Sequence, residues 1–353
     1  MKLRSVILVS LAMLLFFSLS MQTTQAQKGK VTFVSKEAER KVDVMVDGKM
    51  FTSFSWPDNV WKPILYPVYT SAGTDITRGY PMKPRDGERN DHSHQIGIWL
   101  TYGNVNGFDF WGNGSRGLGT KNPNGGVIRH VNVEKVSDGN GEGTLISNEI
   151  WEDPSGKEVM KERTEYRFIA NGKTRIIDRI TTLVPTNGPV LMKDTKEGMF
   201  GIRMARQLEL PSKEKGTLFD AQGNKTTALI GANEGVTGNY RSSEGVTGEA
   251  VWGKRAKWMD LSGTIGSEKI AVVICDHPKN QTYPTYWHAR GYGLFAANPF
   301  GVKDFTENKE ELNYTITAEK PAVIRFRVIV NSGADLTDAE INKLSDEFAK
   351  KYK

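Results

Sequence analysis

Residues 159–184 read VMKERTEYRFIANGKTRIIDRITTLV, and they indicate the fold of the chain more clearly than any other segment. On both sides of Asn171-Gly172 the side chains alternate between apolar and polar, the pattern of a strand with one buried face. An Asn-Gly pair favours the positive φ angles of a tight two-residue turn. The segment therefore predicts a long antiparallel β-hairpin.

The same alternation recurs along most of the chain, with turn residues between the segments. Residues 41–56 alternate on either side of Asp47-Gly48, which is a second hairpin signal. About fifteen strands with few helices predict an all-β protein, a large antiparallel β-sandwich of two stacked sheets. The other segments with a strand pattern are residues 127–136, 144–152, 190–192, 198–210, 251–261, 269–275, 313–319 and 322–330.

One internal region lacks this pattern. Residues 211–248 are rich in Gly, Asn, Ser and Thr, and they repeat Glu-Gly-Val-Thr-Gly at 234–238 and 244–248. Two short copies do not make a repeat architecture, so we interpret the region as a long surface excursion. We expect one β-sandwich domain over residues 27–353, and the alternative is two sandwiches joined by this excursion.

The C-terminus is the clearly helical part of the sequence. Thr337 and Glu340 form a capping box, which marks a helix start. Apolar residues then recur at helical spacing, so the sequence predicts a helix over residues 337–352 that packs one face on the sandwich. These apolar residues are Ile341, Leu344, Phe348 and Tyr352.

The first 26 residues have the pattern of a secretory signal peptide. Lys2 and Arg4 form a basic start, residues 6–19 form an apolar core, and residues 24–26 fit a cleavage site. We therefore expect a periplasmic or secreted protein. The apolar run is too short for a membrane span, and we expect no other membrane segment in the mature chain.

Composition excludes several function classes. Removal of residues 1–26 would lower the formal charge from +6 to +4, and no Lys/Arg stripe indicates a nucleic-acid partner. The lone cysteine, Cys275, lies in an apolar run and cannot form an internal disulfide, so we interpret it as a core residue. The sequence has no Gly-rich phosphate loop, dinucleotide fingerprint or nucleophile elbow. ATP, NAD and nucleic acid are therefore not expected as ligands.

Residues 78–111 hold the first group of candidate site residues. His92 and His94 are two of only five histidines in the chain. If they lie on a strand, their spacing points both side chains to the same face. They would then suit a metal pair completed by Glu197 or another histidine, two donors to one ligand, or a purely structural role. Further along the segment, Asp109 would accept sugar hydroxyls beside a stacking ring, with Trp111 as a further substrate-binding candidate. The alternative is that this motif forms a turn into a buried strand.

A second group interrupts the strand pattern in the middle of the chain. Residues 193–198, KDTKEG, are a run of charges between two apolar segments, and Arg203 follows five residues later. Such a run is usually a solvated turn. A carboxylate at a strand boundary can also serve as a general base, which makes Glu197 a candidate.

A third group lies in the last quarter of the chain. His277 follows the apolar run around Cys275, and Trp287, His288 and Arg290 follow within one short segment. A Trp-His pair with a nearby Arg suits ring stacking and hydrogen bonding to a hydroxylated or carboxylated substrate. The competing interpretation is loop packing.

Taken together, these motifs resemble DUF6807, a bacterial family of exported β-proteins of unknown function. The resemblance implies a galactose-mutarotase-like supersandwich and a role beside carbohydrate degradation. Many relatives carry a third histidine where this chain has Gln95, which weakens a three-histidine metal site. The resemblance rests on the motifs Asp91-His92-x-His94-Gln95-x-Gly97-x-Trp99, Gly103-x-Val105-Asn106-Gly107-x-Asp109-Phe110-Trp111, Trp252-Gly253-x-Arg255-Ala256-x-Trp258, His277-Pro278-x-Asn280, Trp287-His288-x-Arg290 and Asn298-Pro299-Phe300-Gly301.

Such proteins often carry the label "methane oxygenase-like" by automatic transfer. A membrane methane oxygenase needs several membrane spans, and the sequence predicts none in the mature chain. The residues agree better with a sugar-related role.

The sequence thus predicts an exported carbohydrate-active protein that uses His/Glu acid-base chemistry on a mono- or oligosaccharide. Epimerase, lyase and glycoside-cleaving reactions all remain open, and the alternative is a non-catalytic carbohydrate-binding sandwich. No cofactor is expected, with a divalent metal as a secondary hypothesis. We expect one pocket to gather the catalytic candidates His92, His94, Glu197 and His288 and the substrate-binding candidates Asp109, Trp111, Arg203, His277, Trp287 and Arg290.

Overall fold

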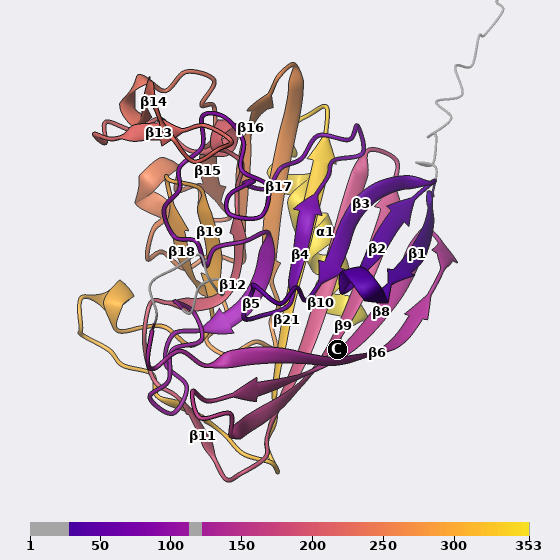
Figure 1. Cartoon of the computed structure of the whole chain (residues 1–353), viewed down its shortest axis with the longest axis vertical. Helices are drawn as coiled ribbons and strands as arrows, with labels where there is room; N and C mark the ends of the chain where they lie inside the picture. Colours follow the sequence, from indigo (N-terminus) through magenta and orange to yellow (C-terminus); the bar gives the residue numbers. More distant parts are fainter. Residues whose placement is uncertain (1–27, 113–121, 353) are drawn as a thin grey trace, which may run out of the picture.

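The computed structural model describes residues 28–112 and 122–352, and strands dominate it (Figure 1). Within this part of the chain, two large antiparallel sheets are accompanied by two small ribbons and one α-helix. The predicted all-β fold with a C-terminal helix is therefore confirmed. No helix among these residues is long and apolar enough to span a membrane. The predicted signal peptide, residues 1–26, lies outside the described residues.

Nine strands form the first large sheet of the described chain. Its order brings strands from the start of the chain beside strands from its last quarter. From one edge to the other, the strands are β18 (Tyr286–Arg290), β19 (Leu294–Asn298), β12 (Gly198–Arg203), β5 (Ile98–Tyr102), β4 (Ile64–Val68), β3 (Lys49–Ser55), β2 (Lys41–Val46), β1 (Lys30–Lys36) and β7 (Gly139–Asn140).

The second large sheet has eight strands in the described residues. They are, in order, β15 (Asn239–Ser242), β16 (Trp258–Ile265), β17 (Glu268–Asp276), β21 (Ala322–Ser332), β10 (Thr174–Pro185), β9 (Glu158–Asn171), β8 (Glu142–Glu152) and β6 (Val127–Ser137). The ribbons pair β11 (Val190–Met192) with β20 (Tyr314–Ile316) and β13 (Thr217–Phe219) with β14 (Lys225–Leu229). Short 3₁₀ helices span Glu37–Glu39, Arg206–Leu208, Ile230–Ala232, Gly248–Val251 and Asp304–Thr306.

Both predicted hairpins form. In the first, Asn171 of β9 pairs with Thr174 of β10, so the two turn residues are Gly172, at a φ of 56°, and Lys173, one position later than the predicted Asn171-Gly172 turn. In the second, Asp47 and Gly48 separate β2 from β3 with φ angles of 50° and 76°, as predicted. Positive φ at both central residues is what a type I′ hairpin turn requires.

Some boundaries differ from the prediction. The strand pattern at 198–210 ends at Arg203, because a 3₁₀ helix follows, and the pattern at 251–261 begins as a strand only at Trp258. Residues 211–248 are not wholly a surface excursion, since β15 joins the edge of the eight-stranded sheet. Strands before and after this region pair with each other, β10 with β21 and β12 with β19, so both large sheets contain strands from each side of it.

The two large sheets pack face to face. Phe51 and Phe168 meet edge to face with ring centroids 6.1 Å apart, one from each sheet. Phe200 and Phe326 stack across the same interface at 4.9 Å. Alternation along each strand supplies the inward side chains, and they merge into one buried hydrophobic cluster between the sheets.

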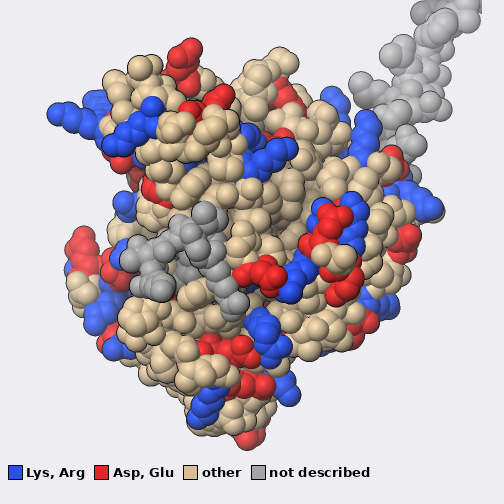
Figure 2. Space-filling view, in the orientation of Figure 1, with Lys and Arg blue, Asp and Glu red and all other residues tan. Residues whose placement is uncertain are grey.

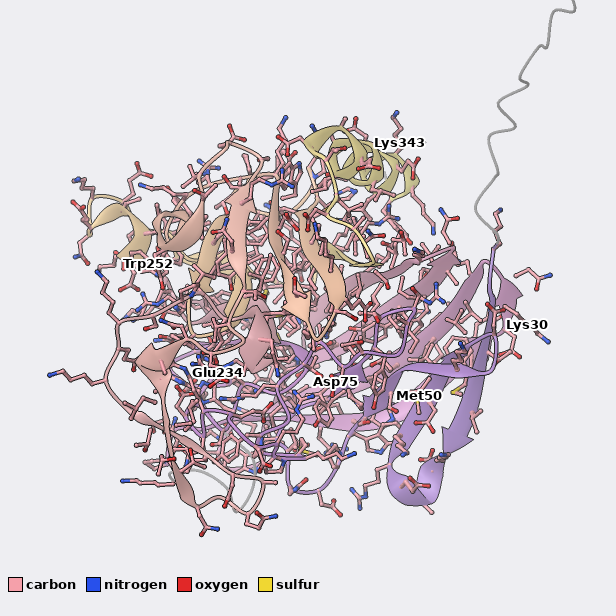
Figure 3. All side chains as sticks on the ribbon, turned by 90° about the horizontal axis from the view of Figure 1, so that it is seen from above. Lys30, Met50, Asp75, Glu234, Trp252 and Lys343 are labelled. Atoms are coloured by element: carbon pink, nitrogen blue, oxygen red, sulfur yellow. The ribbon has the colours of Figure 1, made fainter. Side chains whose placement is uncertain are left out.

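Helix α1 (Asp338–Lys351) covers the outer face of the eight-stranded sheet. The Thr337 hydroxyl accepts from the Glu340 backbone N–H and completes the predicted capping box. Ile341 and Phe348 pack against Ile329 and Cys275 of the sheet. Figure 3, in which Lys343 marks the helix, shows it lying along the strands of the C-terminal half. In the described part of the chain no α-helix covers the outer face of the nine-stranded sheet, and the candidate site lies on that face.

A polar cluster lies between the sheets. Glu149 of β8 and Glu162 of β9 stand directly opposite each other, and both are buried. Glu162 has strong donors: it accepts from Arg179 at 2.7 Å and from the indole of Trp151 at 2.8 Å. Burial and the neighbouring Glu162 charge raise the pKa of Glu149 well above its usual value. Glu149 therefore keeps its proton in the folded protein.

Glu149→Gln should flatten the pH dependence of stability. Above the ordinary glutamate pKa, the unfolded wild type loses a proton that the folded state retains. Wild-type stability therefore falls with rising pH by up to about 1.4 kcal/mol per pH unit. Glutamine has no such proton, so the variant should gain relative stability from pH 5 to pH 8. Urea unfolding across this range measures the slope.

Glu134→Gln serves as the control for this experiment. Glu134 is exposed and pairs with Arg163, which lowers its pKa. Its titration therefore falls below the window, and the variant should keep the wild-type slope. A Glu149→Gln variant with an unchanged slope would contradict the assignment of a retained proton.

Candidate functional site

A cavity of about 560 Å³ opens on the outer face of the nine-stranded sheet, at the edge formed by β5, β12, β19 and β18. Seven of the ten predicted site residues line it, together with five that were not predicted. The predicted ones are His92, His94, Asp109, Trp111, Glu197, His288 and Arg290, and the others are Gln95, Gly103, Gly112, Lys196 and Tyr292.

Strand alternation explains which residues reach the cavity. On β18, Trp287 and Ala289 point into the core between the sheets. The residues between and after them, His288 and Arg290, therefore point outward to the cavity. On β5 the same rule turns Trp99 to the outer face, where it packs with Trp111 in a small separate cluster.

His92 and His94 do not lie on a strand. They occupy a turn before β5, in which the Gln95 backbone N–H donates to the His92 carbonyl at 2.9 Å. The turn holds His92 at a φ of 44°, a left-handed conformation that is uncommon for residues other than glycine. The two rings still face one region, with centroids 5.7 Å apart. Strained backbone of this kind often marks a functional position.

The His92 side chain is held on two sides. Its ring stacks on Tyr292 with centroids 5.0 Å apart and planes 4° from parallel. Its Nδ1 lies 3.4 Å from Oδ1 of Asp91. A carboxylate at this position accepts a hydrogen bond from Nδ1, which leaves Nε2 for contact with a ligand.

His94 lies deeper. Burial lowers the pKa of His94 well below its usual value, so the ring is neutral. Beneath it, the ammonium of buried Lys62 donates to the His94 carbonyl at 2.6 Å and lies 5.3 Å from the centroid of the Trp99 ring. Burial lowers the pKa of Lys62 to about 7. This lysine positions the histidine turn from below.

His288 is oriented by a backbone carbonyl. Its Nδ1 lies 2.9 Å from the carbonyl oxygen of Lys196, which can only accept, so Nδ1 carries the proton. Burial lowers the pKa of His288 to about 4, so the ring is neutral above pH 5 and Nε2 bears the lone pair. Asn298 fixes the same loop, because its amide donates to the carbonyls of Thr195 and Lys196.

Glu197 immediately precedes β12. Its side chain is 36% exposed and lies 3.5 Å from the ammonium of Lys196. Burial nevertheless raises the pKa of Glu197, against the opposing effect of Lys196. Gly103 makes room for this carboxyl, since a Cβ there would come within 2.7 Å of the Glu197 Cβ. The Glu197 carboxyl therefore faces the cavity with Lys196, at 3.5 Å, as its ion-pair partner.

The Asp109 carboxylate accepts hydrogen bonds from the turn that follows it. Its Oδ1 accepts from the backbone N–H groups of Trp111 and Gly112, each at 2.8 Å, and its Oδ2 accepts from the Asn122 amide at 2.8 Å. These bonds hold the Trp111 ring, which lies nearly parallel to the His288 ring at a centroid distance of 6.4 Å. The predicted role of Asp109 as an acceptor for sugar hydroxyls is therefore unsupported by its contacts.

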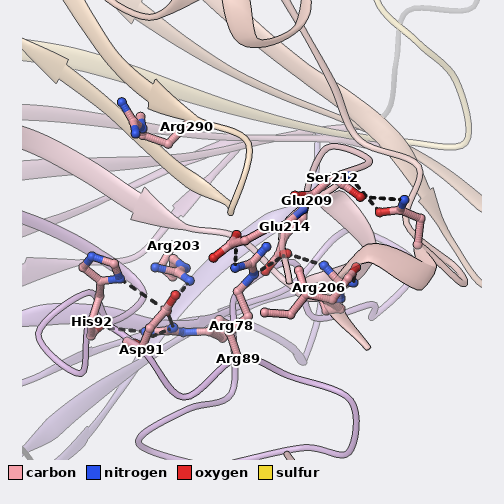
Figure 4. A network of polar contacts seen from close by, with 12 residues as sticks. Arg78, Arg89, Asp91, His92, Arg203, Arg206, Glu209, Ser212, Glu214 and Arg290 are labelled. Carbon is pink, nitrogen blue, oxygen red and sulfur yellow. Dashed lines mark hydrogen bonds and ion pairs between the residues drawn. The ribbon is translucent and has the colours of Figure 1, made fainter. Parts of the chain in front are cut away.

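An ion network supports the cavity from behind (Figure 4). Arg203 is fully buried and donates to Asp91 at 2.7 Å and to the Gln95 side chain. Arg78 donates to the same Asp91 oxygen at 2.9 Å and to the carbonyls of His92 and Gln95. Arg203 was predicted to bind substrate, but the structure places it beneath the floor, where it positions the histidine turn.

The structure keeps two other predicted residues away from the cavity. Trp287 faces the core, and its indole donates to the Ala256 carbonyl at 3.1 Å. His277 follows β17 in the other sheet and packs edge-on against Phe348 of α1, with centroids 5.1 Å apart. Its Nδ1 accepts from the Lys279 backbone N–H, so it shapes a loop.

Three residues near the cavity were missed by sequence reasoning. Tyr292 lies in the β18–β19 turn between two glycines, a setting that looks like ordinary turn chemistry. Lys196 was seen only as part of a charge run. Lys62 stands alone between aromatic and proline residues, and nothing in that pattern predicts a buried ammonium.

Two observations bear on other ligands. Among the described residues, no group of three or more His, Cys, Asp or Glu side chains is arranged to hold a metal ion. Glu197 thus does not complete a metal site with His92 and His94 there. On the face seen in Figure 2, basic and acidic side chains lie intermixed and do not form a basic stripe.

Comparisons with known proteins give one clear result. The model of a family described as "Family of unknown function (DUF6807)" matches residues 41–346. No curated protein matches the chain.

Solved structures show only remote likeness. The structure described as "Crystal Structure Analysis of HI1317" has a TM-score of 0.28 and 8% identity, over 86% of this chain and 99% of that one. The alpha-galactosidase from Lactobacillus brevis has a TM-score of 0.32 and 10% identity, over 91% of this chain and 41% of that one. The GH36 alpha-galactosidase AgaA from Geobacillus stearothermophilus has a TM-score of 0.29 and 9% identity, over 86% of this chain and 40% of that one. The chain spans about two fifths of each alpha-galactosidase chain. Scores this low carry no argument, and the supersandwich stays a prediction.

Proposed function

The chain belongs to the DUF6807 family of unknown function, and from its cavity we propose that it is an enzyme that acts on a mono- or oligosaccharide by acid-base chemistry. The observation that carries the proposal is the pairing of Glu197 with His92 around one cavity of about 560 Å³. This volume lies in the range of small-molecule sites. With the predicted signal peptide, we further propose that the enzyme works in the periplasm or outside the cell.

Glu197 is the proposed base. A base works best when its pKa lies near the operating pH, and burial moves the pKa of Glu197 upward in that direction. His92 is the proposed acid, because its Nδ1 lies 3.4 Å from Asp91 and its Nε2 is left to contact the sugar. Proton transfer between these two groups and a sugar would serve an epimerase, a lyase or a glycoside-cleaving enzyme alike.

The remaining cavity residues suit the binding of a polar ring. Trp111 offers an apolar ring on which the C–H face of a sugar can pack. His288 offers Nε2 as an acceptor for a hydroxyl, because its Nδ1 proton is already bonded to Lys196. Together they would hold one sugar unit between the base and the acid.

Turnover of a glycan is the expected result of a direct assay. The purified protein is incubated with a panel of mono- and oligosaccharides. Nuclear magnetic resonance then follows the appearance of new reducing ends, unsaturated products or inverted centres. A Glu197→Gln sample run in parallel is the blank. A protein that binds sugars and never converts one would contradict the proposal and support the non-catalytic sandwich.

A further inference from the structure

Arg290 is unlike the other arginines around the cavity. It ends β18, lines the cavity beside His288, and packs its guanidinium against the Trp252 ring at 5.6 Å. Within residues 28–112 and 122–352, its guanidinium donates to no protein acceptor. Figure 4 shows Arg290 apart from the network, and no dashed line reaches it. A planar guanidinium with five free donors therefore faces the space where a ligand would lie.

Arginines gather behind the cavity. Four guanidiniums there share three carboxylates, and buried Glu88, which pairs with Arg85 at 2.8 Å, lies near Arg78 as well. Arg78 and Arg203 both use Asp91, and burial beside Arg203 lowers the pKa of Arg78 to about 9. The other members are Arg89, Arg206, Glu209 and Glu214. Arg78 and Arg203 share one Asp91 oxygen, so positive charge remains behind the partly enclosed cavity and attracts an anion into it.

The two carboxylates that line the cavity do not pair with Arg290. Asp109 is occupied by its three turn donors, and Glu197 faces Lys196 at 3.5 Å. Neither bonds to Arg290. A neutral sugar would leave most of the Arg290 donors without a charged acceptor, whereas a carboxylate matches the guanidinium fork with two parallel hydrogen bonds.

Resting on the proposed function, we propose that the sugar bound in this cavity carries a carboxylate, as a hexuronate does, and that Arg290 binds that carboxylate. The Trp252 ring holds the guanidinium plane in place. His288 lies two residues earlier on the same face of β18, so the rest of the sugar ring extends over His288 and Trp111.

Binding experiments separate this proposal from the proposed function. Calorimetry compares the methyl glycosides of glucuronate and galacturonate with those of glucose and galactose, and includes acetate alone. The uronates should bind about 10–100-fold more tightly than the neutral sugars. This preference should shrink with added salt. In Arg290→Gln the two classes should bind alike.

Two matched variants sharpen the test. Arg290→Lys keeps the charge and loses the fork, so it should recover only a minor part of the preference. Arg129→Gln removes a guanidinium from an exposed pair with Glu152 that does not line the cavity, and it should leave binding unchanged. Because the Arg290 side chain makes no protein hydrogen bond in the described chain, its variants should unfold at the wild-type denaturant concentration.

Three outcomes would overturn the inference. Neutral sugars that bind or react as well as uronates would leave the proposed function standing and remove the acidic substrate. Acetate that binds as tightly as the uronates, and depends on Arg290, would indicate a simple carboxylate ligand. A protein that binds none of these sugars would overturn the proposed function together with the inference.

Discussion

Glu197→Gln should lower the turnover of the sugar substrate by about 10²–10⁴-fold, the usual contribution of a general acid-base group. Glutamine keeps the size of the side chain and its place beside Gly103, but it cannot take a proton. Binding should change much less than turnover, because the cavity walls remain. Steady-state kinetics on the substrate found by the glycan assay measures kcat and KM separately.

The pH profile gives a second readout of the same residue. Because burial raises the pKa of Glu197, the ionised base should disappear at a higher pH than for an ordinary glutamate as the solution is acidified. The wild-type rate should therefore fall with decreasing pH, and this limb should be absent from the residual activity of Glu197→Gln. His288, with a pKa of about 4, stays neutral and adds no limb above pH 5.

Glu311→Gln is the matched control for Glu197→Gln. Glu311 also faces a lysine, Lys303 at 3.3 Å, but its side chain is 42% exposed and is not among the residues that line the cavity. This variant should keep wild-type kinetics. A Glu197→Gln enzyme with more than about a tenth of the wild-type turnover would remove Glu197 from the role of base.

Asp178→Asn should destabilise the protein by about 3–5 kcal/mol, the range for removing one partner of a buried ion pair. Asp178 and Arg327 are cross-strand neighbours on β10 and β21, buried and joined by two hydrogen bonds of 2.6 and 2.8 Å. The asparagine would leave the guanidinium without a counter-charge. The loss reaches helix α1 as well, because Arg327 donates to the Leu344 carbonyl and Tyr352 donates to Asp178. Urea unfolding at pH 7 measures the free energy.

An exposed pair of the same shape provides the comparison. Arg163 and Glu134 also form two hydrogen bonds, at 2.8 and 2.7 Å, but both side chains are largely solvated. Glu134→Gln should leave the unfolding midpoint nearly unchanged, since solvent screens such pairs. Equal losses in the two variants would show that burial does not set the cost.

The sheets were predictable because alternation is a local property. Hairpin turns such as Asp47-Gly48 fixed the pairing of neighbouring strands in advance. The pairing of β12 with both β5 and β19 was not readable in the same way. It joins segments about a hundred residues apart, and no sequence pattern in either segment indicates which strand it pairs with.

The candidate site was predictable in its residue types and less so in their placement. Trp287 and His288 were taken together as a pair, although neighbours on a strand face opposite sides and only His288 can reach the cavity. Arg203 and His277 have the right chemistry, but burial under the floor and packing on α1 give them other partners. Arg290 carries the same chemistry without partners, and only the fold shows that difference.

The sheet order also decides when this cavity comes into existence during synthesis. β5 emerges early, β12 follows about a hundred residues later, and β18 and β19 complete the edge only near residue 298. Because the walls come from all four strands, a growing chain has no cavity until its last quarter has been made. Recognition of a ligand thus appears in one late step, after most of the polypeptide has already left the ribosome.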